Sequence, residues 1–249
     1  MRCLAALVFI LFLFPSMAMA QFVMPPWNAR SSALGGALLF DTDTRHVDVS
    51  YRQEFMLAGM ADKRLSLVWP TGKVGTAMAS YIHHGNIDYH EQQAMAAYAI
   101  RPLSWLLVGV GGEYLHVGTS DAQYVPRHWL AATVYSQATV GNRTELALVV
   151  GSCPWGKYNK WRARMQVQYR PLVGMLTVLE GEVEDRARLR FGMEYNHRGP
   201  FFFRAGLSTA PVVGTFGLGF RYSHFCIDLA AEVHQWLGVT PHTTLSVCF

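Results

Sequence analysis

The chain has 249 residues, of which 51% are hydrophobic, 13% aromatic and only 15% charged, and its net charge is +4. Disordered chains are polar and poor in aromatic residues, so this composition excludes a disordered protein and predicts one folded unit. The basic residues are spread along the chain without a cluster that could follow nucleic-acid phosphates. We therefore expect no nucleic-acid partner.

The first twenty residues have the three-part pattern of a cleaved secretory signal. Arg2 precedes an apolar stretch over residues 4–14, and the small residues of Ala18-Met19-Ala20 stand before Gln21. This apolar stretch is too short to cross a membrane as a helix. We expect residues 1–20 to be removed and the mature protein to begin near Gln21.

From about Val47 to the end, the apolar residues recur mostly at every second position, in segments of about eight to eleven residues separated by turn residues. This period is typical of β-strands with two different faces. The expected strands cover residues 47–55, 64–69, 75–82, 88–99, 105–117, 128–139, 144–151, 162–170, 175–184, 188–196, 201–209, 215–222, 225–234 and 242–249. About fourteen antiparallel strands, an even number, predict an all-β, up-and-down transmembrane barrel with short periplasmic turns and longer extracellular loops.

Three consecutive expected strands each carry charged residues of one sign at alternate positions. The residues are Arg162 and Arg164, then Glu180, Glu182 and Glu184, then Arg188 and Arg190. Antiparallel neighbours place such side chains opposite one another, where opposite charges attract. The rows fit the polar lumen of a membrane barrel, and an ion-paired exposed face of a soluble β-sandwich is the alternative.

Three cysteines follow the signal: Cys153, Cys226 and Cys248. So few cysteines, and an odd number of them, exclude a disulfide scaffold. Cys226 and Cys248 are expected on the same face of adjacent strands, which leaves open a cross-strand disulfide or two free thiols.

Two loops carry side chains suited to chemistry, the first to binding a transition metal and the second to hydrolysis. They contain His83, His84, Asp88 and His90, and then His116, Ser120, Asp121 and His128. Neither group forms a diagnostic motif, and polar loops between strands often have this composition. We expect no metal, no cofactor and no catalytic residue, and a barrel enzyme is the less favoured alternative.

The segment Asn28-Ala29-Arg30-Ser31-Ser32-Ala33-Leu34-Gly35-Gly36-Ala37 resembles the N-terminal motif of the FadL-like superfamily of outer-membrane barrels, especially its PorV/PorQ branch in Bacteroidetes-type bacteria. The closing segments, which include Thr215–Phe220 and Thr240-Pro241, are similar to the ends of PorV-like relatives. The terminal Phe249 resembles the signal by which outer-membrane barrels are recognised for insertion.

The resemblance implies a bacterial outer-membrane barrel over residues 47–249 with a plug-like N-terminal segment over residues 21–46. Its PorV branch implies a non-enzymatic accessory subunit of an export or assembly machine, with type IX secretion first and barrel assembly second. The partners would then be outer-membrane lipids and a larger barrel with its lipoproteins. The alternative is a FadL-like transporter of small hydrophobic molecules. The short chain, and the sequence Leu38–Asp43 where the family has Asn-Pro-Ala, favour the accessory role.

Overall fold

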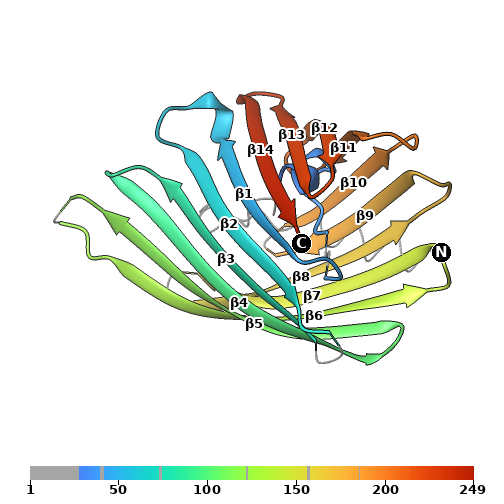
Figure 1. Ribbon diagram of the computed structural model, residues 1–249. Coiled ribbons are helices and arrows are strands. Elements are labelled where there is room, and N and C mark those ends of the chain that lie inside the picture. The colour runs from blue at the N-terminus through green and yellow to red at the C-terminus, as the bar shows by residue number, and fades with distance from the viewer. Residues whose placement is uncertain (1–27, 40–41, 73–74, 122, 156–157, 185) are drawn as a thin grey trace, which may run out of the picture.

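The computed structural model is a closed barrel that describes residues 28–39, 42–72, 75–121, 123–155, 158–184 and 186–249 (Figure 1). In this part of the chain, fourteen antiparallel strands each pair with their neighbours in sequence, and β1 closes the barrel against β14. The strands are β1 (His46–Gln53), β2 (Ala61–Pro70), β3 (Thr76–Gly85), β4 (Tyr89–Leu103), β5 (Leu106–Thr119), β6 (Arg127–Val140), β7 (Thr144–Trp155), β8 (Tyr158–Tyr169), β9 (Met175–Val183), β10 (Ala187–Tyr195), β11 (Phe201–Ser208), β12 (Val213–Tyr222), β13 (Phe225–His234) and β14 (Gly238–Cys248).

The predicted fold class and strand number are confirmed, and most strand ends differ from the predicted bounds by one to four residues. One of the largest differences, of four residues, is at β14, which begins at Gly238 rather than at residue 242. Pro241 does not end this strand, because it lies within the β13–β14 ladder opposite Ala231. The β4 strand likewise continues past residue 99 to Leu103, through an irregularity in its pairing with β5.

The two faces of the strands have opposite chemistry. Large apolar side chains such as Val110, Phe203 and Phe216 point outward and are more than half exposed. Polar and charged side chains such as Asp48, Glu113 and Arg204 point inward and are buried. A soluble β-sandwich would bury its apolar face, whereas this inverted arrangement suits a wall surrounded by lipid.

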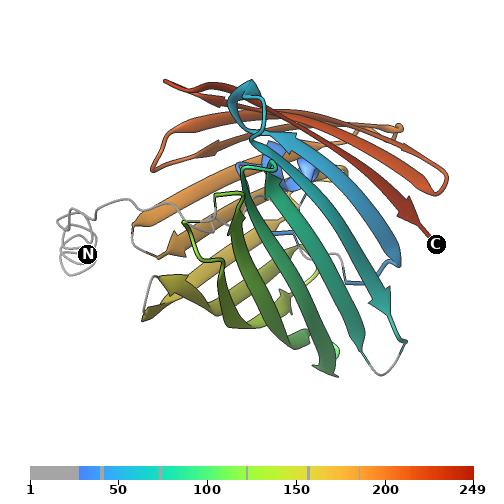
Figure 2. The same cartoon turned by 90° about the vertical axis from the view of Figure 1, so that its left-hand side faces the viewer.

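The first strand, β1, begins and the last strand, β14, ends at the same end of the cylinder, which we call the terminal end (Figures 1 and 2). There the backbone N–H of Phe249 donates to the carbonyl of Arg45 at 3.0 Å. The β2–β3 and β12–β13 turns lie at this end, and the β1–β2 and β13–β14 connections lie at the opposite, distal end. The two longest connections between strands, over residues 54–60 and 120–126, lie at the distal end, and barrels of this type have their longer loops outside the cell, so we take the distal end as extracellular.

A short helix, α2 (Ala29–Ala33), lies inside the barrel against β11–β14 (Figure 1). Asn28 caps it, because its side-chain oxygen accepts a hydrogen bond from the N–H of Ser31 at 2.9 Å. Gly35 and Gly36 then turn the chain with φ of +76° and +80°, a conformation that strongly favours glycine. None of the helices in the described residues is both long and apolar enough to cross a membrane.

The expected signal segment, residues 1–20, lies outside the described residues, as do positions 21–27 of the plug-like segment. Cys226 and Cys248 are not bonded to each other, so the cross-strand disulfide is not formed. The hairpin register explains this result, because Cys226 lies opposite Ser246 rather than opposite Cys248.

Candidate functional site

The N-terminal segment is fixed to one side of the lumen by hydrogen bonds and an ion pair. Arg30 donates from Nε and Nη2 to the two carboxylate oxygens of Glu194, each at 2.7 Å. Ser32 donates to Glu232 at 2.6 Å, and Thr215 donates to the carbonyl of Ala33 at 2.9 Å. These contacts reach β10, β12 and β13, so the segment is held as a plug against these strands.

Three glycines on neighbouring strands form the surface on which the plug rests. A Cβ atom at Gly192 would lie 2.7 Å from the Cβ of Leu34, and one at Gly217 would lie 2.4 Å from that of Ala33. A Cβ atom at Gly206 would lie 2.4 Å from the backbone nitrogen of Gly35. Real Cβ atoms need more space than this, so the absence of side chains at these glycines lets the plug backbone approach the wall.

The charged rows that alternate in the sequence meet inside the lumen. Arg164 contacts Glu182 at 3.0 Å, and Arg190 contacts both Glu180, at 2.6 Å, and Glu182. The cross-strand register places Arg164 opposite Glu182 on β8 and β9, and Arg190 opposite Glu180 on β10 and β9. Arg162 is also buried, so five of the seven row residues lie within the wall of the lumen.

The other two row residues lie closer to solvent. The Arg188 side chain is 31% exposed, and its nearest carboxylate oxygen, on Glu182, is 3.7 Å away. Glu184 lies beyond Val183, the last residue of β9, because the chain leaves the sheet there. The dense ion-paired region therefore lies closer to the middle of the barrel than to the distal rim.

The segment after the plug crosses the lumen at Leu38. The backbone N–H of Leu38 donates to Glu180 at 2.8 Å, and its carbonyl accepts a hydrogen bond from the side-chain amide of Gln166. Leu38 is therefore tied to β8 and β9, away from the strands that hold α2. Its apolar side chain lines the part of the lumen next to β3–β8.

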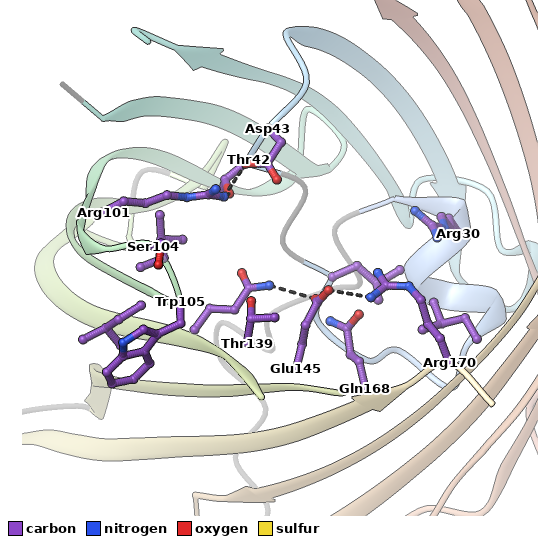
Figure 3. A pocket seen from close by; sticks show the side chains of 15 residues that line it. Arg30, Thr42, Asp43, Arg101, Ser104, Trp105, Thr139, Glu145, Gln168 and Arg170 are labelled. Carbon is purple, nitrogen blue, oxygen red and sulfur yellow. Dashed lines mark hydrogen bonds and ion pairs between the residues drawn. The ribbon is translucent and has the colours of Figure 1, made fainter. Parts of the chain in front are cut away.

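Three cavities lie in the lumen, and the distal one also borders the plug segment at Gly35 and Gly36. A distal vestibule of about 580 Å³ includes Phe55, Asp62, Tyr89, Arg190 and Leu237 in its lining. A terminal vestibule of about 260 Å³ is lined by polar residues such as Arg101, Thr139, Glu145, Gln168 and Arg170 (Figure 3). Between the two lies a space of about 40 Å³, which we call the neck.

The terminal vestibule is polar and internally hydrogen-bonded. Glu145 accepts from Gln137 at 3.0 Å and from Arg170 at 2.5 Å, so it joins β6, β7 and the end of β8 (Figure 3). Arg101 binds Asp43 and approaches Thr42, which ties the segment leading into β1 to the end of β4. These contacts leave the cavity open between the plug segment and the β4–β5 turn.

The neck is the apolar part of an otherwise charged lumen. Its apolar lining residues are Leu38, Met78, Met95, Ala97, Tyr135 and Val149, with Gly111 and Gly151 between them, and Arg162 and Arg164 line its β8 side. Glu113 closes one side, where it accepts hydrogen bonds from Gln93 at 2.8 Å and from Thr133 at 3.0 Å. A volume of about 40 Å³ holds little more than one water molecule, so the neck separates the two vestibules in this structure.

The structure divides the first expected metal-binding group between the two faces of the wall. His84 points inward, and its Nδ1 lies 2.6 Å from the carboxylate of Asp62. His83 and His90 stack with ring centroids 5.8 Å apart. Among the described residues, no group of three or more His, Cys, Asp or Glu side chains is arranged to hold a metal ion.

The expected hydrolytic group is likewise not brought together as one site. His116 and His128 contact each other, with ring centroids 4.7 Å apart, and His90 joins them at 5.6 Å from His116. Ser120 instead donates to Asp88 at 3.4 Å, and Asp121 accepts from the backbone N–H of Gln123. The cluster of imidazoles depends on strand register, so grouping the histidines by sequence position missed it.

No family model matches the sequence, and no curated protein is significantly similar to it. Solved structures with a similar fold include the TodX deltaS2S3 mutant, a monoaromatic hydrocarbon channel, with a TM-score of 0.59 and 10% identity over 91% of this chain and 98% of that chain. The outer membrane protein Omp33 of Acinetobacter baumannii has a TM-score of 0.58 and 9% identity over 83% of this chain and 98% of that one. At this level of identity the likeness concerns the fold, which is that of outer-membrane β-barrels.

Proposed function

We propose that this chain is a non-enzymatic outer-membrane channel that passes small hydrophobic molecules from the distal to the terminal vestibule. The observation that carries the proposal is the apolar neck, which lies in line between two cavities in a lumen that is otherwise polar. Ions would lose hydration in the apolar part of this constriction, and Glu113 and Arg164, which also line it, are already bound to other lumen side chains.

The residues of the neck suit an apolar solute of variable shape. Met78 and Met95 are unbranched and can change rotamer to widen the space, and Ala97 and Gly111 leave room along the wall. The plug and the ion pairs of Arg190 with Glu180 and Glu182 lie on the other side of the lumen. In this proposal they keep water and ions from passing beside the neck. The hydrocarbon channel among the similar folds supports the same type of solute.

The PorV-like accessory role in type IX secretion, or in barrel assembly, stays a prediction from the sequence. Its motif residues Arg30, Leu34 and Gly35 make contacts within this chain, to Glu194, Gly192 and Thr215. These contacts account for the motif as plug packing, so we prefer the channel. A larger barrel and lipoproteins recovered in stoichiometric amounts from native outer membranes would favour the accessory role instead.

The neck can be tested by filling it. We expect Ala97→Phe to abolish the protein-dependent uptake of radiolabelled naphthalene by cells with an intact outer membrane, because a phenyl ring does not fit beside Met95 in the neck. Ala96→Phe is the matched control, because Ala96 is exposed on the outer face of the same strand. Unchanged naphthalene uptake by the Ala97→Phe protein, at equal amounts of folded barrel, would refute the channel.

We also propose that Phe249 acts as the insertion signal. Its backbone N–H bonds to Arg45, while its side chain is 69% exposed and contributes little to the packing of the barrel. We expect Phe249→Ser to lower the assembled fraction in cells severalfold and to leave refolding of the purified protein in detergent unchanged. The control is Phe225→Ser, which alters another exposed phenylalanine at the terminal end. Equal assembly of all three proteins would rule the signal out.

A further inference from the structure

Strand register aligns polar side chains in one row across the outer wall. Lys63 lies opposite His83, His83 opposite Gln92, Gln92 opposite His116, and His116 opposite His128. Residues directly opposite in an antiparallel ladder share a face, so this row crosses β2–β6 near the distal end (Figure 2 shows the outer face of the first of these strands). With His90, which also contacts this row, we call these residues the histidine row.

The next register row toward the middle of the barrel is apolar. It contains Leu65, Tyr81, Ala94, Tyr114 and Leu130, which lie opposite one another in the same order of strands. All five are exposed, and Leu130 is 76% exposed. The change from an apolar row to a polar row marks the edge of the lipid-facing band, and lipid head groups lie at this depth.

The imidazoles of the histidine row touch one another. Ring centroids are 5.8 Å apart for His83 and His90, 5.6 Å for His90 and His116, and 4.7 Å for His116 and His128. The hydroxyl of Tyr114, in the apolar row, lies 2.6 Å from Nδ1 of His128. The four rings therefore form one continuous cluster of imidazoles beside a surface of apolar side chains.

The charged groups that face this surface are cationic or titrate to cationic forms. Within the described residues, the charged groups with an electrostatic effect on His83 are His90, Lys63 and His84. The groups with such an effect on His116 are His128 and His90. Adjacent imidazolium ions repel one another, so protonation of several of them requires an anion nearby.

The carboxylates of the neighbouring elements have other partners. On β2–β4, Asp62 binds His84, and Glu91 accepts a hydrogen bond from the hydroxyl of Tyr89. In the loops, Asp88 accepts a hydrogen bond from Ser120, and Asp121 accepts one from the backbone N–H of Gln123. None of these contacts involves a ring of the histidine row. The negative charge that would complement the row must therefore come from outside this part of the wall.

We propose that the histidine row binds the phosphate groups of phosphorylated lipids in the surrounding outer leaflet. A phosphate at this depth accepts hydrogen bonds from the ring N–H groups and pairs with Lys63, while the acyl chains lie against the apolar row below. Histidine titrates near physiological pH, so the row binds more tightly as the surface is acidified. When the imidazoles are neutral, the row carries only the positive charge of Lys63, and a phosphate group is more negative than this. Binding of phosphate therefore favours protonation of the imidazoles in the complex.

The test measures binding of diphosphorylated lipid A to the purified barrel in detergent by native mass spectrometry at pH 6 and pH 8. We expect roughly tenfold tighter binding at pH 6, because three exposed ion pairs of ordinary strength together change affinity by about that factor. The variant with His90→Gln, His116→Gln and His128→Gln should bind at pH 6 as weakly as the wild type does at pH 8. The single variant His128→Gln, at an exposed position, gives a partial loss if the triple variant does not fold.

His197→Gln is the matched control, because His197 also stacks on a tyrosine, Tyr195, but at the terminal end of the barrel. It should bind lipid A as the wild type does. Equal binding by the wild type and both row variants would overturn the proposal. Equal binding of dephosphorylated lipid A, or complete displacement by millimolar inorganic phosphate, would overturn it as well. Loss of a co-purifying protein without loss of lipid would instead make the row a protein-docking surface.

Discussion

Replacement of Glu180 by alanine is expected to destabilise the barrel by about 3–5 kcal/mol, which is the usual cost of removing one partner from a buried ion pair. Glu180 is 0% exposed, and it holds three groups at once. It accepts from Arg190 at 2.6 Å, from the backbone of Leu38 at 2.8 Å and from Gln166 at 3.3 Å. Its loss leaves a buried guanidinium with less compensation and releases the segment that crosses the lumen.

The measurement is the free energy of unfolding in urea, followed by tryptophan fluorescence in phospholipid vesicles. Asp43→Asn is the control, because Asp43 pairs with Arg101 at the exposed rim, where a pair contributes about 1 kcal/mol or less. A loss of stability for Glu180→Ala no larger than that of the control would show that the ion-paired rows do not stabilise the lumen.

The barrel could be predicted from the sequence because each strand carries its own evidence. Alternation with a period of two fixes the two faces of a strand, and the turn residues fix where one strand gives way to the next. Neighbouring strands of an up-and-down barrel are also neighbours in sequence, so the meeting of Arg164 with Glu182 needed no long-range information. The ends of the strands are harder to predict, because a residue such as Pro241 can either end a strand or lie within it.

The histidine row could not be predicted in the same way. His83 and His84 are adjacent in sequence, yet they lie on opposite faces of β3, and only the pairing register brings His83 near His90 and His116 near His128. A shift of one residue in that register would send one side of each pair to the lumen. The group of His83, His84, Asp88 and His90 therefore mixed residues from two faces and a loop.

The cavities and the glycine surface were also beyond the sequence, for a different reason. The neck depends on which lumen side chains fill the space left by the plug, and its volume follows from packing rather than from any motif. The short chain favoured the accessory role because it leaves little plug. In the structure a helix of five residues is enough to occupy one side of the lumen.

Gly206→Val is expected to displace this plug. A Cβ atom at Gly206 would lie 2.4 Å from the backbone nitrogen of Gly35, 2.6 Å from Oγ1 of Thr215 and 2.7 Å from the carbonyl carbon of Leu34. Two of these atoms belong to the plug backbone, so no change of side-chain rotamer relieves the contact. The hydrogen bond from Gly35 to Thr215, at 3.1 Å, would be lost, at a total cost of about 1–3 kcal/mol for overpacking.

The displaced plug should be detected as protease cleavage within residues 28–39 of the folded barrel and as a higher ion conductance in planar bilayers. Gly181→Val is the matched control, because it adds the same side chain within a strand where the nearest atom to the new Cβ, on Leu189, is 3.7 Å away. If Gly206→Val folds and both proteins resist cleavage and conduct equally little, then α2 does not close the lumen. The ion-paired rows and Leu38 would then be sufficient to close it, since these contacts do not involve Gly206.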